Sequence, residues 1–146
     1  MTTTISVQRD LQAERRAAAE AFRRDLTSRG IFCVNMLSSP GAGKTALLQA
    51  MAQHWAGRVR MVALTGDIAT DRDAQRLAPY VPVRQLTTGG ACHLELPLVQ
   101  RGWNELIQDN VEFLFIENIG NLVCPASPDL GEPLRAVVLS GTEGDD

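Results

Sequence analysis

The chain is organised around Ser38-Ser39-Pro40-Gly41-Ala42-Gly43-Lys44-Thr45, which lies between an apolar run over residues 31–37 and a helical pattern over residues 46–55. An apolar, β-branched run that turns into a glycine-rich loop and then into a helix is typical of a phosphate-binding loop. The backbone N–H groups of such a loop and of the helix start converge on an anion. This stretch therefore predicts a strand, a phosphate site and a helix, in that order.

Each residue type in the loop has a chemical reason to be there. Gly41 and Gly43 let the backbone approach a phosphate closely. Lys44, expected to be exposed at the helix start, reaches the terminal phosphates, and Thr45 supplies a hydroxyl for Mg²⁺. The signature G-x-x-x-x-G-K-[ST] would have glycine where this chain has Ser38. The alternative, a corner that merely needs glycine, does not need a Lys-Thr pair. The predicted nucleotide-binding residues are Pro40, Gly41, Ala42, Gly43, Lys44 and Thr45.

Composition limits the classes of protein to consider. The 146 residues, 45% hydrophobic and 21% charged, are typical of one globular domain. A net charge of −3 argues against nucleic-acid binding, which needs clustered positive charge. The apolar runs are too short to span a membrane, and the first residues do not resemble a signal peptide. We therefore expect a cytoplasmic protein with no nucleic-acid or membrane partner.

Acidic residues follow two of the apolar runs. Asp67 comes after the run over residues 59–64, and Glu117 ends the run over residues 113–116. Ligand sites collect at the carboxyl ends of parallel strands, where an acidic side chain reaches Mg²⁺ or its waters. Glu117 also has the Walker B arrangement, in which a carboxylate orients a water. The alternative for Asp67 is an N-cap of the next helix, for which Thr70 and Asp71 are equally suited.

Strand and helix patterns alternate along the chain. Strands are predicted over residues 31–37, 59–64, 81–86, 113–116 and 134–139, with helices between the first four. This alternation predicts an α/β fold: a mostly parallel sheet of about five strands with helices on both faces, the layout of a P-loop NTPase. A helix over residues 9–26 precedes it, with a solvated arginine face and an apolar face of Leu11, Ala18, Phe22 and Leu26.

The three cysteines differ in context, and their odd number predicts no disulfide framework. Cys33 lies within an apolar strand and is assigned to the core. Cys92 and His93 are predicted to open a helix, whose N-terminus favours the thiolate. Cys124 follows another strand at the same sheet edge. Cysteine and histidine together suit Zn²⁺ or Ni²⁺. The alternative is a buried thiol beside a helix-capping histidine.

With these residues taken together, the chain resembles a known family. The motifs Thr65-Gly66-Asp67, Asp73-Ala74, Cys92-His93-Leu94 and above all Glu117-Asn118-Ile119-Gly120-Asn121-Leu122-Val123-Cys124-Pro125-Ala126, with the phosphate loop, resemble the HypB family. HypB proteins are GTPases that help to insert nickel into [NiFe]-hydrogenase. The related urease accessory GTPase UreG has a Cys-Pro-His loop that this sequence does not contain.

The resemblance implies a GTP-dependent homodimer of the SIMIBI class of P-loop proteins, with Ni²⁺ or Zn²⁺ at the dimer interface. It implies a HypA-type nickel chaperone and the hydrogenase large-subunit precursor as partners. By position, the nickel or zinc ligands are Cys92, His93 and Cys124. Thr45, Asp67 and Glu117 surround Mg²⁺, and the residues implied to act in GTP hydrolysis are Lys44, Asp67 and Glu117.

The sequence also departs from the family. Residues 1–30 form a helical extension without the Cys-rich or His-rich metal motif of some members, and Ser127-Pro128 stands where the family usually has Ser-Phe. The P-loop GTPase domain over residues 31–146 contains no Asn-Lys-x-Asp guanine-reading strand, so we expect it to be incomplete at its C-terminus.

Three functions compete on this sequence. The first is a GTP-hydrolysing nickel metallochaperone. The second is a metal-binding remnant or fragment without nucleotide turnover, which the missing guanine-reading strand suggests. The third is a P-loop kinase or another ATP-using enzyme, disfavoured because no lid or acceptor site is recognisable.

Overall fold

The computed structural model describes residues 2–67, 72–106, 108–124 and 128–141. Helices and strands alternate from α1 to β4, β5 follows β4 directly among the described elements, and these five strands run parallel in the order β3-β2-β4-β1-β5. This confirms the predicted parallel sheet. The elements are α1 (Thr2–Ser28), β1 (Phe32–Ser38), α2 (Lys44–Trp55), β2 (Met61–Asp67), α3 (Arg72–Leu77), β3 (Val83–Thr87), α4 (Leu96–Asn104), β4 (Phe113–Glu117) and β5 (Leu134–Val138).

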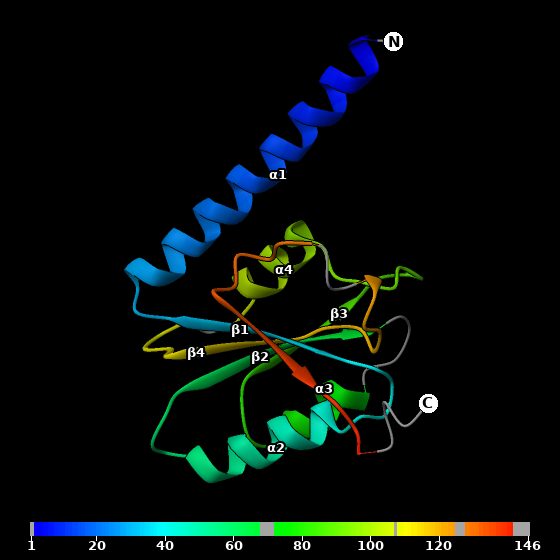
Figure 1. Cartoon of the computed structure of the whole chain (residues 1–146). Coiled ribbons are helices and arrows are strands. Elements are labelled where there is room, and N and C mark those ends of the chain that lie inside the picture. Colours follow the sequence, from blue (N-terminus) through cyan, green and yellow to red (C-terminus); the bar gives the residue numbers. More distant parts are fainter. Residues whose placement is uncertain (1, 68–71, 107, 125–127, 142–146) are drawn as a thin grey trace.

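Helices cover both faces of the sheet, so the fold has three layers (Figure 1). The last turns of α1 and the whole of α4 lie on one face, and α2 and α3 lie on the other. Strand β4 is buried on both sides: Leu114 and Ile116 belong to the first core and Phe115 to the second. Since successive side chains of a strand point to opposite faces, a strand in this position is apolar along its length, and β4 is apolar from Phe113 to Ile116 before it ends in Glu117.

Helix α1 is longer than predicted, and much of its length extends away from the sheet (Figure 1). Ala19, Phe22 and Leu26 are buried, whereas Leu11 is 50% exposed and Ala18 is also exposed. The predicted apolar face is therefore wrong in its first half, because that half has no core to cover. Arg15, Arg16 and Arg24 are exposed, as predicted for a solvated arginine face. Arg23 is half-buried and donates two hydrogen bonds to Asp129, at 2.8 and 2.9 Å.

Two predicted boundaries need correction. Helix α4 begins at Leu96 and not at Cys92, because Pro97 is tolerated only in the first turn of a helix. Cys92 and His93 therefore lie in a loop, without a helix N-terminus to favour the thiolate. Strand β2 continues to Asp67, so this residue ends the strand and does not follow it. Thr70, Asp71, the middle of the predicted turn over residues 124–128 and the acidic tail lie outside the described residues.

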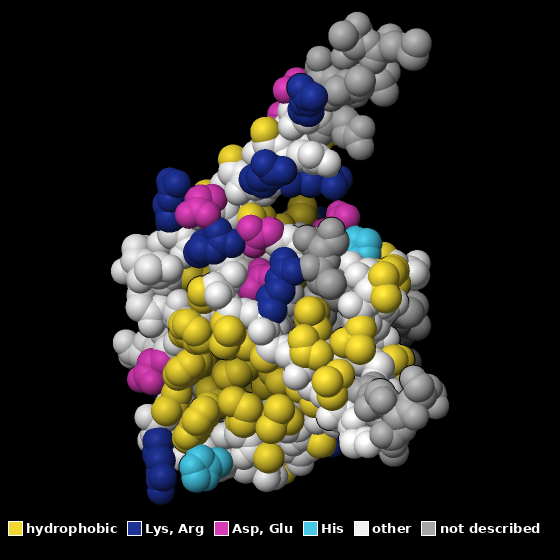
Figure 2. Space-filling model, in the orientation of Figure 1, with side chains coloured by type: hydrophobic (Ala, Val, Ile, Leu, Met, Phe, Trp, Pro, Cys, Tyr) yellow, Lys and Arg dark blue, Asp and Glu magenta, His cyan; other side chains and the backbone are white. Residues whose placement is uncertain are grey.

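Strand β5 is the last strand of the sheet and pairs with β1. Its apolar residues remain largely accessible: Leu134 is 48% exposed, Val137 is 55% exposed, and Leu139 just beyond the strand is 62% exposed. Hydrophobic side chains gather on this face of the molecule, in the region of β5 and α2 (Figure 2). Among the described residues, no helix is long and apolar enough to cross a membrane.

Candidate functional site

A pocket of about 460 Å³ lies at the carboxyl ends of β1, β2 and β4. All of the predicted nucleotide-binding residues, Pro40 through Thr45, line it. Gly41 and Gly43 have positive φ angles of 76° and 96°, which explains the glycines at these positions. Gly120 after β4 passes so close to the loop that a Cβ there would lie 3.1 Å from the Cα of Pro40. The phosphate loop is therefore held between α2 and the segment that follows β4.

Glu117, Lys44 and Thr45 form a buried polar cluster beside this pocket. The Thr45 hydroxyl donates a hydrogen bond to Oε1 of Glu117, and the Lys44 ammonium lies 3.6 Å from the same oxygen. Lys44 is only 8% exposed, so the expectation of an exposed lysine is wrong. The buried carboxylate attracts the ammonium inward, which sequence spacing alone does not reveal because Glu117 is 73 residues further along the chain.

Burial raises the pKa of Glu117 above its ordinary value. The hydrogen bond from Thr45 and the charge of Lys44 act in the opposite direction, and the nearby charge of Asp73 adds to the rise. The second carboxylate oxygen, Oε2, is buried without a hydrogen-bond partner. Buried polar atoms without a partner are rare, and an unpaired carboxylate oxygen next to a threonine hydroxyl matches the ligands that Mg²⁺ takes from proteins. The residues present therefore fit a magnesium ion.

Further charged residues line the same pocket. Asp67 lies at the end of β2, as predicted, and Asp73 and Arg76 reach the pocket from α3. The Arg76 guanidinium donates a hydrogen bond of 3.3 Å to Gln49. Sequence reasoning gave Asp73 and Arg76 no role, although Asp73-Ala74 belongs to the motifs that resemble the HypB family. Their helix is short and polar, so its pattern gave no indication of which side chains face the pocket.

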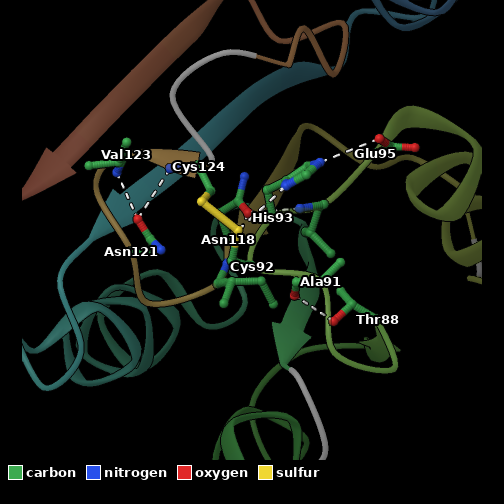
Figure 3. Close-up of a disulfide and its surroundings, with 11 residues drawn as sticks. Thr88, Ala91, Cys92, His93, Glu95, Asn118, Asn121, Val123 and Cys124 are labelled. Carbon is green, nitrogen blue, oxygen red and sulfur yellow. Dashed lines mark hydrogen bonds and ion pairs between the residues drawn. A yellow bond between two sulfur atoms is a disulfide. The ribbon is translucent and has the colours of Figure 1, made fainter.

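The structure brings Cys92 and Cys124 together and joins them in a disulfide (Figure 3). The expectation that the cysteines form no disulfide is therefore wrong for this pair. Their Cα atoms are 6.0 Å apart, a separation at which two sulfurs with no metal between them can bond. His93 adjoins the pair: its Nδ1 lies 3.8 Å from Sγ of Cys92, and its Nε2 lies 3.3 Å from Oε1 of Glu95.

Metal ligation by these residues stays a prediction. In the described ranges, no group of three or more His, Cys, Asp or Glu side chains is arranged as a metal site, and the two sulfurs are bonded to each other. Cys33 is fully buried in the core, as predicted. Burial raises the pKa of its thiol, and the charge of Glu132 adds to this effect. Cys33 therefore stays protonated and apart from the Cys92–Cys124 pair.

Comparison with known proteins gives consistent matches. A family model described as CobW/HypB/UreG, nucleotide-binding domain, matches residues 33–136. The hydrogenase/urease maturation factor HypB of Helicobacter hepaticus is 40% identical over 148 residues, covering 98% of this chain and 60% of that protein. The crystal structure of the hydrogenase maturation factor HypB from Archaeoglobus fulgidus matches with a TM-score of 0.81 and 34% identity over 92% of this chain and 66% of that one. The crystal structure of HypB from Helicobacter pylori in complex with nickel matches with a TM-score of 0.77 and 35% identity, and the match covers 85% of this chain and 59% of that one.

The curated HypB proteins that the chain matches are longer than it is, and the chain spans between 47% and 65% of their lengths. The matched region begins within β1 and ends within β5. It contains the phosphate loop, the two strand-end carboxylates Asp67 and Glu117, and both cysteines of the disulfide. The parallel sheet and the pocket are those of a P-loop NTPase. The chain belongs to the CobW/HypB/UreG family of nucleotide-binding proteins.

Proposed function

We propose that this chain is the nucleotide-binding part of a GTP-hydrolysing nickel metallochaperone that serves [NiFe]-hydrogenase maturation. One observation carries the proposal. Glu117 contacts Lys44 and Thr45, two residues that line the pocket. Cys124 belongs to the cysteine pair, and only seven positions separate it from Glu117, in the segment that follows β4. A change in the conformation of that segment when nucleotide binds would affect both the pocket and the cysteine pair. Nucleotide and metal are thermodynamically linked if both favour the same conformation of the segment.

The pocket residues have distinct roles in the proposed hydrolysis. The N–H groups of the loop over residues 40–45 and the Lys44 ammonium bind the phosphates. Thr45, Asp67 and Glu117 would hold Mg²⁺, which when bound neutralises charge on the phosphates. Glu117, as a buried hydrogen-bond acceptor beside the pocket, orients the attacking water.

The second half of the proposal concerns the metal cargo. In the reduced chain, the thiolates of Cys92 and Cys124 and the imidazole of His93 are the proposed ligands for Ni²⁺, or for Zn²⁺ in its place. Three ligands leave the shell of such an ion incomplete, and a second copy of the chain related by two-fold symmetry would complete it. A homodimer, a HypA-type chaperone and the hydrogenase large-subunit precursor are the partners that the proposal implies.

The alternative is a metal-binding module without nucleotide turnover. Residues 31–146 contain no Asn-Lys-x-Asp motif, so base preference is the property to measure for this chain. Without that motif we expect the chain to bind GTP and ATP with similar affinity, since buried polar groups are what reject the wrong base. A strong preference for GTP would show that the guanine-reading residues lie elsewhere in this chain.

Nucleotide titration tests the proposal. Calorimetry with GTP and Mg²⁺ is expected to give binding for the wild-type chain and at least a tenfold loss for Lys44→Ala, the effect of one charge-assisted hydrogen bond. Arg16→Ala, an exposed cation on α1, is the matched control and should bind as the wild type does. Equal affinity of Lys44→Ala and the wild type would contradict the phosphate site. Binding without phosphate release would favour the module without turnover.

A further inference from the structure

Asn118 follows Glu117 directly and is almost completely buried, at 1% exposure. Its side-chain oxygen Oδ1 accepts hydrogen bonds from the N–H groups of Leu94, at 3.2 Å, and Ile119, at 2.9 Å. Its own backbone N–H donates to the carbonyl of Met36 in β1, at 3.0 Å. Asn118 therefore connects the end of β4 to β1 and to the loop in front of α4.

Leu94 is the residue next to His93, so the bond to Asn118 anchors the loop that carries Cys92 and His93 (Figure 3). The Leu94 side chain is itself fully buried and packs against β2, where a Cβ on Gly66 would lie 2.9 Å from it. Because Leu94 is anchored by both its backbone and its side chain, it fixes the position of the end of the loop that carries Cys92 and His93. The Cys92 loop is thus placed by contacts with strands that are distant in sequence.

Cys124 is placed by a second asparagine of the same segment. Oδ1 of Asn121 accepts hydrogen bonds from the N–H groups of Val123, at 2.8 Å, and Cys124, at 3.2 Å (Figure 3). Such local side-chain to backbone bonds are typical of asparagine in turns. The segment after β4 therefore holds both cysteines: Asn121 holds Cys124, and Asn118 holds the loop of Cys92.

The other side of Asn118 is fixed by a buried polar chain. Its Nδ2 donates to Oδ1 of Asn35 at 3.1 Å, and Nδ2 of Asn35 donates to Oε1 of Glu132 at 3.4 Å. Glu132 is buried and accepts further hydrogen bonds from Arg135, at 2.6 Å, and from the N–H of Leu130, at 2.8 Å. This chain gives the Asn118 amide nitrogen an acceptor, whereas the N–H groups of Leu94 and Ile119 hold its oxygen without involving Asn35.

We propose that Asn118 is a positioning residue that brings Cys92, and His93 with it, onto Cys124. The bond between Asn118 and Leu94 raises the effective concentration of one thiol at the other. The effect of this bond on disulfide formation does not depend on the proposed metal function. Its effect on metal affinity rests on that proposed function. Because partners that orient metal ligands affect affinity, loss of the bond is expected to weaken metal binding as well.

Two alanine substitutions separate positioning from simple stability. Asn118→Ala and Asn35→Ala each remove the bond between the two amides from the same buried chain, but only Asn118→Ala removes the acceptor for Leu94. Reduced protein is equilibrated with reduced and oxidised glutathione. One protein thiolate attacks the glutathione disulfide and releases one glutathione thiolate. The second protein thiolate then attacks the mixed disulfide at the protein sulfur and displaces the other glutathione, so two molecules of glutathione thiol are released for each protein disulfide formed. Thiol titration then gives the equilibrium constant.

The disulfide equilibrium constant is expected to fall about fivefold to tenfold in Asn118→Ala, the equivalent of one lost hydrogen bond, and to stay within about twofold in Asn35→Ala. Asn118→Asp retains the acceptor and should recover most of the wild-type value. If Asn118→Ala does not fold, Asn118→Ser serves in its place, since its shorter hydroxyl cannot span to Leu94. Equal constants for the Asn118 and Asn35 variants would overturn the proposal.

Nickel titration of the fully reduced variants, followed by thiolate-to-nickel absorption, is the second measurement. Asn118→Ala is expected to bind Ni²⁺ about 10-fold to 100-fold more weakly than Asn35→Ala. A wild-type chain that binds no nickel, together with disulfide constants that differ as expected, would contradict the proposed metal function and support the role of Asn118. Nickel binding with equal affinity in both variants would overturn the role of Asn118 and leave the metal function standing.

Discussion

Glu117 combines two properties at the scale of a single residue. Its carboxylate is buried with one oxygen unpaired, and it draws Lys44 and Thr45 inward from the phosphate loop. A buried charge with incomplete compensation is unfavourable for folding. The chain keeps this arrangement at the place where we propose that a magnesium ion and phosphates bind. Local instability at such a site is consistent with a ligand that supplies the missing interactions.

The first prediction concerns the pH dependence of stability. The folded chain binds the Glu117 proton more tightly than the unfolded chain, because burial raises the pKa from its ordinary value of 4.5. Stability contributed by this proton is present below pH 4.5 and is lost as pH rises towards the folded pKa, by at most about 1.4 kcal/mol per pH unit. Glu117→Gln has no such proton and should become progressively more stable than the wild type over this range. Urea unfolding at a series of pH values measures the difference, and a constant difference would contradict the prediction.

The second prediction concerns the cysteines. In the presence of a reductant, Cys92→Ala, His93→Ala and Cys124→Ala are each expected to weaken Ni²⁺ or Zn²⁺ binding at least tenfold, since each removes a proposed ligand. In the oxidised chain the wild type should bind neither metal at these residues, because disulfide sulfurs are not thiolates. Isothermal titration with and without reductant makes both comparisons.

Cys33→Ala is the matched control for that experiment. Cys33 is buried in the core and protonated, so its loss should leave metal affinity unchanged and reduce stability slightly. Equal metal affinity in the Cys92 and Cys33 variants would return the pair to the structural interpretation, a thiol beside a histidine without a metal.

At the residue scale, sequence was informative where the chemistry is local. Gly41, Gly43 and Thr45 lie within five consecutive residues, and the motif that they form was enough to predict that they line the pocket. The inward turn of Lys44, the disulfide and the bonds of Asn118 were not predictable, because each depends on a segment that the sheet brings in from elsewhere. The resemblance to the HypB family indicated Cys92 and Cys124 together, but not that their sulfurs meet directly.

At the scale of elements, α4 shows how closely a helix can approach the sheet. Gly102 in this helix faces two core leucines of β2 and β3: a Cβ there would lie 2.5 Å from Cδ2 of Leu86 and 3.0 Å from Cδ2 of Leu64. This close packing brings the helix, and the loop in front of it, against the strand ends. Helix position and loop position are therefore coupled.

The third prediction tests this packing. Gly102→Ala is expected to destabilise the fold by up to about 2 kcal/mol, because overpacking a buried contact outweighs the gain of about 1 kcal/mol in helix propensity. Urea unfolding gives the free energy. Gly141→Ala is the control, since a Cβ at that position meets no atom within 4 Å. A Gly102→Ala chain as stable as the control would show that Leu86 and Leu64 move aside.

The sequence predicted which segments are helices and which are strands, but it misplaced some of their first and last residues. Five strands and their order along the chain followed from apolar runs, since β-strands buried on both faces must be apolar throughout. Pro97 was the available signal for the start of α4, and it was not used. The apolar spacing of α1 gave no sign that its first half extends beyond the sheet, because periodicity reports a face and not what covers it.

For the molecule as a whole, the exposed side chains around β5 are the main departure from an ordinary globular surface. Leu134 and Val137 are exposed in β5 at the edge of the sheet, and Leu139 is exposed just beyond this strand. Hydrophobic side chains also gather on the surface in the region of β5 and α2 (Figure 2). Contiguous exposed apolar surface and an unpaired strand edge both favour association. The chain is therefore expected to associate in solution through this apolar surface.

The fourth prediction follows from this surface. The wild-type chain should bind hydrophobic dyes and associate with increasing concentration in sedimentation experiments. Val137→Thr combined with Leu139→Thr should reduce both, because the changes remove apolar surface while threonine keeps a strong preference for strands. Leu11→Thr, at an exposed but isolated position of α1, is the control and should change neither. A monodisperse monomer without dye binding would contradict the prediction.

The pairing of Lys44 with Glu117 has a consequence for the chemical labelling of the protein. Lys44 is the only lysine in the sequence, and every other cationic side chain at neutral pH is an arginine. An acylating reagent directed at amines therefore finds one side-chain target apart from the chain's amino terminus, and that target is 8% exposed and engaged with a carboxylate. The rate at which this amine is acylated directly reports how open the phosphate pocket is. A reagent that couples the protein to a surface through this lysine would at the same time block the pocket.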